Sequence, residues 1–199
     1  MALRVRGFVT TGAAIAACML IAACTPEPPT VVNTPTPTVS TPTASPTPTE
    51  SEIKRQMRLD YEAAESAYRG AVAEGERLSQ QGGSKAASPK LRAVATGDYL
   101  TLQVKALRIL RSRGWHLVGN ARILGVQPVG GWNATELTIR ACEDNSPWKL
   151  MDKRGRDVTP KDKSDYIQLL TFTKSKGNWK VADVSTQRVQ SVERADCES

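Results

Sequence analysis

A proline- and threonine-rich segment, residues 25–49, most restricts how this chain can fold. It holds eight of the twelve prolines, and threonine or serine fills most of its other positions. Such a composition lacks the apolar side chains whose burial would offset the entropy lost on ordering. We therefore expect residues 24–49 to form a disordered stalk, extended and polyproline-like at about 3.1 Å per residue. The globular domain is then expected to comprise residues 50–199.

The first 23 residues have the organisation of a secretory signal peptide. Arg4 and Arg6 precede an uncharged stretch, Phe8 to Ala23, that is rich in Ala, Ile, Leu and Val. This stretch has 16 residues, fewer than the roughly 20 that a membrane-spanning helix needs. Removal of residues 1–23 as a signal peptide is therefore the favoured interpretation. A retained transmembrane anchor is the alternative.

The end of this apolar stretch, Leu20-Ile-Ala-Ala-Cys24, resembles the lipobox of bacterial lipoproteins, in the actinobacterial style. The resemblance implies cleavage between Ala23 and Cys24, a diacylglyceryl group on the Cys24 thiol, and acylation of the new amine, for example with palmitate. Two or three acyl chains anchor a protein stably, whereas one gives marginal binding. We therefore expect a lipid anchor in the cell membrane, with the domain on the extracytoplasmic side.

The remaining cysteines favour a structural disulfide. Cys18 lies in the signal peptide, so Cys142 and Cys197 are left as an even pair in a compartment where disulfides persist. A bridge would close a loop of about 56 residues and stabilise the domain by about 4 kcal/mol in the chain-entropy model. A metal or redox pair is the weaker alternative, because the chain has no CxxC spacing and a single histidine, His116. We expect no metal and no cofactor.

The charge of the exported chain is modestly positive. The formal net charge is +7, and removal of Arg4 and Arg6 with the signal peptide leaves about +5. Such a surface can favour acidic envelope polymers or anionic lipid headgroups, although solubility is the simpler explanation. Basic residues of the segment 149–163 alternate with three aspartates, which indicates a solvated loop. We expect no nucleic-acid partner.

Three helices are predicted at the start of the domain. Thr49 and Glu52 have capping-box spacing, and Gly82-Gly83 ends the first helix. Ser88-Pro89 begins a second, and Asp98 is expected to cap a third that ends at Gly114. Apolar or small residues recur at helical spacing along the first of them, at Ile53, Met57, Tyr61, Ala64, Tyr68, Ala71, Gly75 and Leu78.

Strand patterns follow the helices. Alternating apolar residues and turn signals predict strands over 115–129, 132–143, 148–151, 166–173 and 179–189, with a hairpin turn at Gly130-Gly131. Helices followed by a meander of strands predict an α+β fold.

The first helix with Tyr61 and Tyr68, the turn at 91–97, and Gly177-Asn-Trp-Lys-Val181 together resemble the nuclear-transport-factor-2-like cone fold. The resemblance covers most of residues 50–190. It implies N-terminal helices packed in a curved antiparallel sheet. That fold includes isomerases, cyclases and hydrolases as well as binding modules, so it does not select a function. The side chains that would serve chemistry inside the cone are Tyr61, Tyr68, Asp98, Tyr99 and His116.

Each candidate also has a structural explanation that we favour. Tyrosines on an apolar stripe usually fill the core with the hydroxyl at its edge. Asp98 is explained as a helix cap, and His116 has no acid or nucleophile beside it in the sequence. Trp132 and Trp148 are candidates for an exposed aromatic patch, but tryptophans on strands more often pack in the core.

These patterns favour a non-catalytic interaction module of the cell envelope over an enzyme. The expected partner, besides the membrane reached through the lipid anchor, is an envelope protein or polymer. Surface lipoproteins of this general kind are also carried by prophages, and that resemblance implies superinfection exclusion as one possible role. The alternative is a small-molecule pocket protein, or a hydrolase or isomerase, that uses the cone interior.

Overall fold

The computed structural model describes residues 50–189 and residue 191. The predicted signal peptide, the lipobox with Cys24, the stalk and Cys197 lie outside the described residues, as does Thr49 of the expected capping box. Within the described part of the chain, no helix has the length and apolar character needed to cross a bilayer.

The longest helix, α1 (Glu50–Gln80), packs along the sheet. Its predicted stripe is confirmed from Tyr61 to Leu78, where Ala64, Tyr68 and Ala71 are completely buried, but the first two members of the stripe, Ile53 and Met57, are exposed. The helix ends where expected. The amide of Gly83 donates to the carbonyl of Leu78 at 2.9 Å, and Gly83 has a φ of 80°, which glycine adopts without strain.

Two further helices follow, α2 (Pro89–Val94) and α3 (Gly97–Arg113). The predicted cap is confirmed at Ser88, whose hydroxyl accepts a hydrogen bond from the Leu91 amide at 3.0 Å. The predicted capping role of Asp98 is wrong. The N-cap position of α3 is Thr96, so Asp98 falls in the first turn, where a carboxylate is favoured by the helix dipole.

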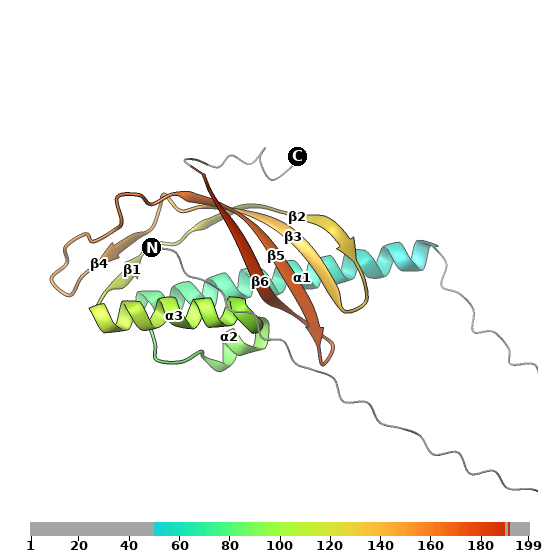
Figure 1. Cartoon of the computed structure of the whole chain (residues 1–199), viewed down its shortest axis with the longest axis horizontal. Coiled ribbons are helices and arrows are strands. Elements are labelled where there is room, and N and C mark those ends of the chain that lie inside the picture. The colour runs from blue at the N-terminus through green and yellow to red at the C-terminus, as the bar shows by residue number, and fades with distance from the viewer. Residues whose placement is uncertain (1–49, 190, 192–199) are drawn as a thin grey trace, which may run out of the picture. The chain divides into compact units, whose positions relative to one another are not determined.

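The strands form one curved, open sheet and one small ribbon. The main sheet is antiparallel in the order β2-β3-β5-β6. The ribbon pairs β1 with β4. The bounds are β1 (His116–Val118), β2 (Arg122–Trp132), β3 (Glu136–Asp144), β4 (Lys149–Met151), β5 (Asp165–Ser175) and β6 (Asn178–Val189). The predicted α+β fold, with the N-terminal helix packed on a curved antiparallel sheet, is confirmed (Figure 1).

Two predicted strand boundaries are wrong. The single strand expected over 115–129 is split at Gly119, whose φ is 81°. Gly130-Gly131 lies inside β2 and makes a register shift, not a turn. The turn comes three residues later. There the side-chain oxygen of Asn133 accepts hydrogen bonds from the amides of Thr135 and Glu136, both at 2.8 Å.

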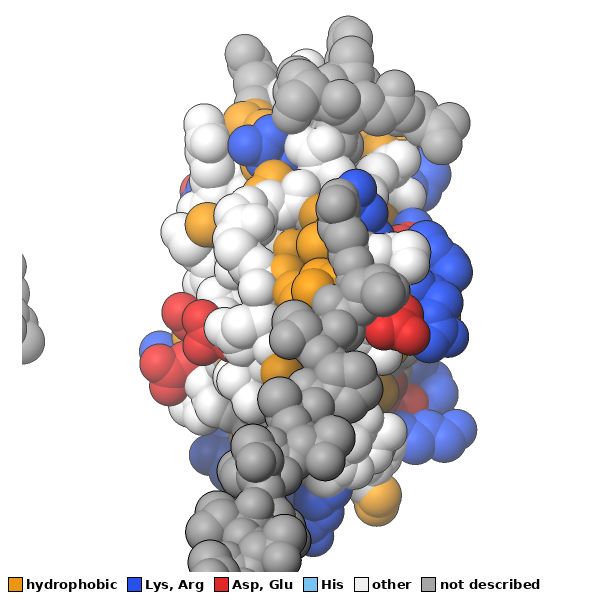
Figure 2. Space-filling model, turned by 90° about the vertical axis from the view of Figure 1, so that its right-hand side faces the viewer, with side chains coloured by type: hydrophobic (Ala, Val, Ile, Leu, Met, Phe, Trp, Pro, Cys, Tyr) orange, Lys and Arg blue, Asp and Glu red, His pale blue; other side chains and the backbone are white. Residues whose placement is uncertain are grey.

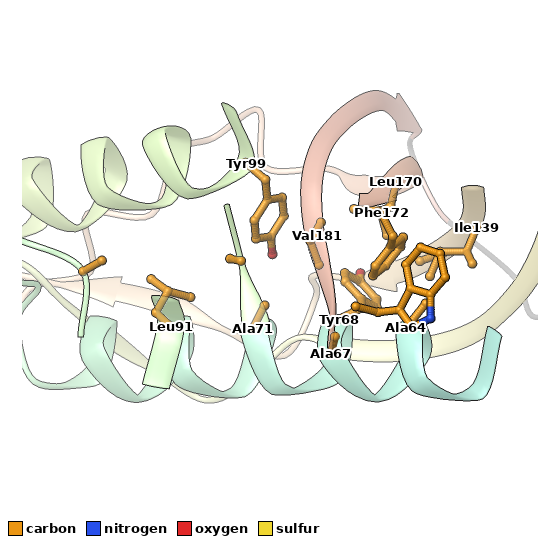
Figure 3. Packing of buried hydrophobic residues seen from close by; sticks show 14 of the residues in the cluster. Ala64, Ala67, Tyr68, Ala71, Leu91, Tyr99, Ile139, Leu170, Phe172 and Val181 are labelled. Carbon is orange, nitrogen blue, oxygen red and sulfur yellow. The ribbon is translucent and has the colours of Figure 1, made fainter. Parts of the chain in front are cut away.

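The core lies between α1 and the concave face of the sheet. Figure 3 shows Tyr68 and Ala64 of α1 against Phe172, Leu170 and Ile139 from the strands. The helix α3 is held at the sheet edge, because the Thr96 amide donates to the carbonyl of Val181 on β6 at 2.8 Å. Large side chains thus fill the middle of the concave face of the sheet.

Candidate functional site

A half-open pocket of about 360 Å³ lies beyond this packed middle, where β3 ends and β5 begins. It is bounded by the second half of α1, by α3, and by the ends of the strands. The residues lining it are Val72, Gly75, Glu76, Ser79, Tyr99, Leu102, Gln103, Ala106, Leu117, Ala121, Glu143, Asn145, Trp148, Tyr166, Gln168, Val184 and Thr186. Its volume is within the range of small-ligand sites.

A buried carboxyl group, Glu143, forms part of the pocket wall. It follows Leu137, Ile139 and Ala141 on alternate positions of β3, so its side chain shares their inward face. One oxygen, Oε1, accepts a hydrogen bond from the hydroxyl of Tyr68 at 2.5 Å. The other, Oε2, accepts one from the amide nitrogen of Gln168 at 3.0 Å. Glu143 is only 7% exposed.

Burial in this pocket shifts the pKa values of two of its side chains, Glu143 and Tyr99. Burial raises the pKa of Glu143 above its usual range, and the nearby Glu76 carboxylate raises it further, while the Tyr68 hydrogen bond acts in the opposite direction. The pKa of Tyr99 is also raised, first by burial and then by Glu143. A carboxyl group of altered pKa in a cavity is a typical property of functional sites, although it also occurs in structural networks.

Glu76 supplies the second carboxylate of the pocket lining, from α1. Its Oε1 accepts from the amide of Ala121 and its Oε2 from the side-chain amide of Asn120, both at 2.6 Å. These two bonds fix the connection between β1 and β2 against α1. The carboxylate therefore both shapes the rim and contributes negative charge to it.

Three aromatic rings, those of Tyr99, Trp148 and Tyr166, belong to the same lining. Figure 3 shows the Tyr99 side chain extending from α3 toward α1, with its hydroxyl at the inner end. Tyr166 lies directly opposite Glu143 in the pairing of β5 with β3. Residues in such a pair point to the same side of a sheet, so the ring and the carboxyl group are neighbours.

The structure brings two of the five sequence candidates to this pocket. Tyr99 lines it, and the Tyr68 hydroxyl holds Glu143 from the core side. The others lie elsewhere. Asp98 is exposed in the first turn of α3. Tyr61 lines a separate apolar groove between α1 and β2, and His116 lines a hollow with Trp115 and Lys153.

The groove lined by Tyr61, of about 530 Å³, lies toward the start of α1, where Ile53 and Met57 remain 43% and 38% exposed. Figure 2, which views that end of the domain, shows exposed hydrophobic side chains in a narrow column between polar and basic surfaces. Its charged lining residues are one basic side chain, Arg58, and two acidic ones, Glu62 and Glu65. Arg58 pairs with Glu62, and Glu65 pairs with Arg69, so these groups do not converge on the groove.

A second buried carboxylate, Asp60, lies at the same end of α1. It accepts hydrogen bonds from the indole nitrogens of Trp179 and Trp132, at 2.8 and 3.1 Å, and from Lys174 at 2.9 Å. Burial opposes its ionisation, but the hydrogen bonds of Trp179, Lys174 and Trp132 outweigh burial and lower the pKa of Asp60. This network joins α1 to β2, β5 and β6 at one end of the sheet and is structural.

The two tryptophans proposed as an exposed patch are therefore partly buried and separate. Trp132 packs against the core and bonds to Asp60. Trp148 lines the pocket, and its indole nitrogen donates to the side-chain oxygen of Asn145 at 2.7 Å. The favoured expectation of core packing is confirmed for Trp132, and the alternative, one exposed aromatic patch formed by both residues, is wrong.

Glu143, Gln168 and Glu76 were missed by the sequence reasoning. One signal was present, because Glu143 continues the alternation of Leu137, Ile139 and Ala141 and so places a charge on the inward face of β3. Gln168 likewise shares the inward face of β5 with Leu170 and Phe172, at alternate positions of the strand, so it places a polar group among buried residues. Among the residues that the structure describes, no group of three or more His, Cys, Asp or Glu side chains is arranged to hold a metal ion.

Comparisons with known proteins give only distant structural likenesses. No protein-family model matches the chain, and no curated protein matches it. The intermembrane space region of the chloroplast protein ARC6 is 17% identical, with a TM-score of 0.46 over 65% of this chain and 98% of that chain. A cystatin-like domain of unknown function from Nostoc punctiforme is 14% identical, with a TM-score of 0.35 over 69% and 82%.

A protein from Kribbella flavida is 9% identical, with a TM-score of 0.32 over 73% of this chain and 99% of that one. None of these three is described as a lipoprotein or as a nuclear-transport-factor-2-like protein, so both resemblances stay predictions. Likenesses at this level add nothing to the assignment of a function.

Proposed function

We propose that the chain is a membrane-anchored surface lipoprotein whose domain, residues 50–199, is a non-catalytic binding module of the cell envelope. The lipobox that ends at Cys24 supports the anchor. The proline-rich composition of residues 25–49 supports a stalk that separates the domain from the bilayer. In this arrangement, the domain meets its ligand at a distance from the membrane.

The half-open pocket beside Glu143 is the observation that supports a binding role most directly. The Glu143 carboxyl group is held by Tyr68 and Gln168 from two other elements, α1 and β5. A polar group fixed in this way is preorganised, so little side-chain entropy is lost when a ligand binds. A rigid, partly apolar pocket with a few convergent polar groups is what small-ligand recognition requires.

The anchor is tested by Cys24→Ala. The wild-type protein is expected in the membrane fraction, with a mass that includes the lipid and lacks residues 1–23. The variant is expected to be released or left unprocessed. Identical fractionation and mass for the two proteins would show that the chain is not a lipoprotein.

The partner is expected to be an envelope protein or polymer, and its binding would serve assembly, sensing or superinfection exclusion. Proximity labelling in intact cells, with the full-length protein as the bait, tests this. The labelled molecules should differ between the wild type and a variant with a blocked pocket, Ala106→Trp. Identical labelling would place the partner on another surface, and the pocket would then have no part in its capture.

A second candidate function is a hydrolase or isomerase that uses the pocket, with Glu143 as its general acid or base. The raised pKa of Glu143 in a cavity is the observation that favours it. Screening the purified protein against ester, epoxide and ketone substrates distinguishes the two. Turnover that disappears in Glu143→Gln would identify an enzyme, whereas binding without turnover supports the module.

A further inference from the structure

The pocket differs in charge from the chain that contains it. The whole chain has 27 Lys and Arg against 20 Asp and Glu. Among the described residues that line the pocket, however, two are glutamates and none is Lys, Arg or His. A chain with an excess of basic residues thus forms its polar cavity from acidic, amide, hydroxyl and aromatic side chains. This local reversal of charge favours a positively charged ligand.

The carboxylate of Glu143 retains capacity for such a ligand. Each of its oxygens receives one hydrogen bond, from Tyr68 and from Gln168 respectively, and a carboxylate oxygen can accept two. A cation that binds beside Glu143 would favour its ionised form and so offset the effect of burial. Glu76, at the rim, adds a second negative group at the entrance.

The aromatic residues complete this environment. The faces of Tyr and Trp rings attract cations, and such rings are the usual surroundings of quaternary ammonium ligands. Trp148 already makes one interaction of this type, because the Lys163 ammonium lies 4.9 Å from the centre of its ring. That ammonium is held by the carbonyls of Ser146 and Trp148, at 3.0 and 2.8 Å, and Lys163 is not part of the lining.

One further basic residue lies close to the rim. Arg188 is the cross-strand neighbour of Tyr166 on β6. Its side chain is 67% exposed and pairs with Asp162 at 3.6 Å. The guanidinium group is therefore directed into solvent toward an acidic partner.

We propose that this pocket binds a small organic cation, with its ammonium group between the Glu143 and Glu76 carboxylates and against the rings of Tyr99, Tyr166 and Trp148. The volume of about 360 Å³ suits a ligand of the size of a choline or a short amine. The inference names a ligand class for the pocket and rests on the binding function proposed above.

Calorimetric titration of the full-length protein in a non-ionic detergent tests the proposal. The probes are choline and ethanolamine, with the uncharged tert-butyl analogue of choline as the matched control. Choline is expected to bind about tenfold or more tightly than its neutral analogue, because only the cation gains the carboxylate and ring interactions. Equal affinity for choline and the neutral analogue, or no binding of either cation, would overturn the proposal.

Variants locate the effect. Glu143→Gln should weaken choline binding about tenfold and remove the preference over the neutral analogue. Glu136→Gln, on the exposed end of the same strand, should leave both unchanged. If Glu143→Gln does not fold, Tyr166→Leu at the rim replaces it and should also weaken choline binding. Normal choline binding in a folded pocket variant would show that the site lies elsewhere.

Failure of this inference is distinct from failure of the proposed function. A protein that stays lipid-anchored and captures an envelope partner, but binds no cation, contradicts only the cation site. A protein that binds choline but fractionates like its Cys24→Ala variant contradicts only the lipoprotein assignment.

Discussion

The hydroxyl of Tyr68, on α1, lies 2.5 Å from the Oε1 atom of Glu143, on β3. Both side chains are buried, so this hydrogen bond joins helix to sheet inside the domain and separates the apolar core from the pocket. Burial and the adjacent Glu143 raise the pKa of Tyr68 well above its usual value, which keeps the hydroxyl protonated as the donor. The Glu143 carboxyl group is therefore held in one position in the pocket wall, and this position depends on the hydrogen bond from Tyr68.

Removal of the Tyr68 hydroxyl should destabilise the domain. Tyr68→Phe leaves the packing of the ring in place but removes one of the two hydrogen bonds that Glu143 accepts. We expect the free energy of unfolding to fall by about 2 kcal/mol, as is usual for a buried bond to a charged or polar group. Urea unfolding measures it. Tyr61→Phe, at a half-buried ring on the same helix, is the control, and an equal loss there would contradict the interpretation.

Glu143 should make stability depend on pH. Because burial raises its pKa, the folded chain retains the Glu143 proton at pH values where the unfolded chain has lost it. The free energy of unfolding contributed by this group is full below the unfolded-state pKa and is lost as pH rises through the folded-state pKa. Urea unfolding from about pH 4 to pH 8 should show a decline in the wild type that is reduced in Glu143→Gln.

The substitution is suited to this test because the Gln168 amide can rotate to present its oxygen to the new NH₂ group, while the Tyr68 hydroxyl still donates to the new carbonyl. Parallel stability curves for the wild type and Glu143→Gln would show that Glu143 titrates as an ordinary carboxyl group.

Local signals predicted the helical half of the fold well. Ser88-Pro89 and Gly114 act through the conformation of a few adjacent residues, and both are where the sequence placed them. The hairpin turn predicted at Gly130-Gly131 is wrong because glycines permit either a turn or a register shift within a strand. The pairing of β2 with β3 decides between these, and that pairing involves residues distant in the sequence.

The candidate site was predictable only in part, for the same reason. Tyr68 and Tyr99 could be named as residues on helices, but their partner Glu143 is 75 residues from Tyr68 in the sequence. The carboxyl group acquires its role from burial between α1, β3 and β5, which no local pattern encodes. The alternation that places Glu143 on the inward face of β3 was available as a signal, and it indicates a buried charge without indicating its partner.

Asp60 should be essential for the other end of the domain. Asp60→Asn removes the negative charge that receives Lys174 and the indole groups of Trp179 and Trp132. We expect a loss of about 3 kcal/mol in the free energy of unfolding, because the substitution leaves a partly buried ammonium without its counter-charge. Urea unfolding followed by tryptophan fluorescence measures this loss directly.

The matched control for Asp60 is Glu62→Gln, two residues farther along α1. Glu62 pairs with Arg58 at 2.7 Å, and both side chains are more than half exposed. Exposed pairs contribute little, so the control should change stability by less than about 1 kcal/mol. Similar losses for the two variants would mean that the Asp60 network contributes no more than a surface ion pair.

Glu74 should contribute stability that acid removes. Two hydrogen bonds from Arg77, at 2.6 and 2.8 Å, and one from the α2 cap residue Ser88, at 2.7 Å, lower the pKa of Glu74 to about 2. A lowered pKa stabilises the folded state above the unfolded-state value and loses that contribution as pH falls toward about 2.

Glu74→Gln is therefore expected to cost about 2 kcal/mol near neutral pH. The difference from the wild type should shrink as pH falls below the usual carboxyl range. Circular dichroism during urea unfolding at several pH values measures it. Glu65→Gln, which affects only an exposed pair with Arg69, should show neither effect, and a Glu74→Gln deficit that persists unchanged in acid would contradict the pKa assignment.

The predicted Cys142–Cys197 disulfide gives the last test. Cys142 is completely buried, beside Leu124, Ile167 and Val189, and Cys197 lies outside the described residues. If the bridge forms, a reductant should lower the melting temperature of the wild type by on the order of 10 °C, because it releases a long loop in the unfolded chain. Cys197→Ser should have the melting temperature of the reduced wild type, and reductant should not change it. A wild-type melting temperature that reductant does not change would rule out a stabilising bridge.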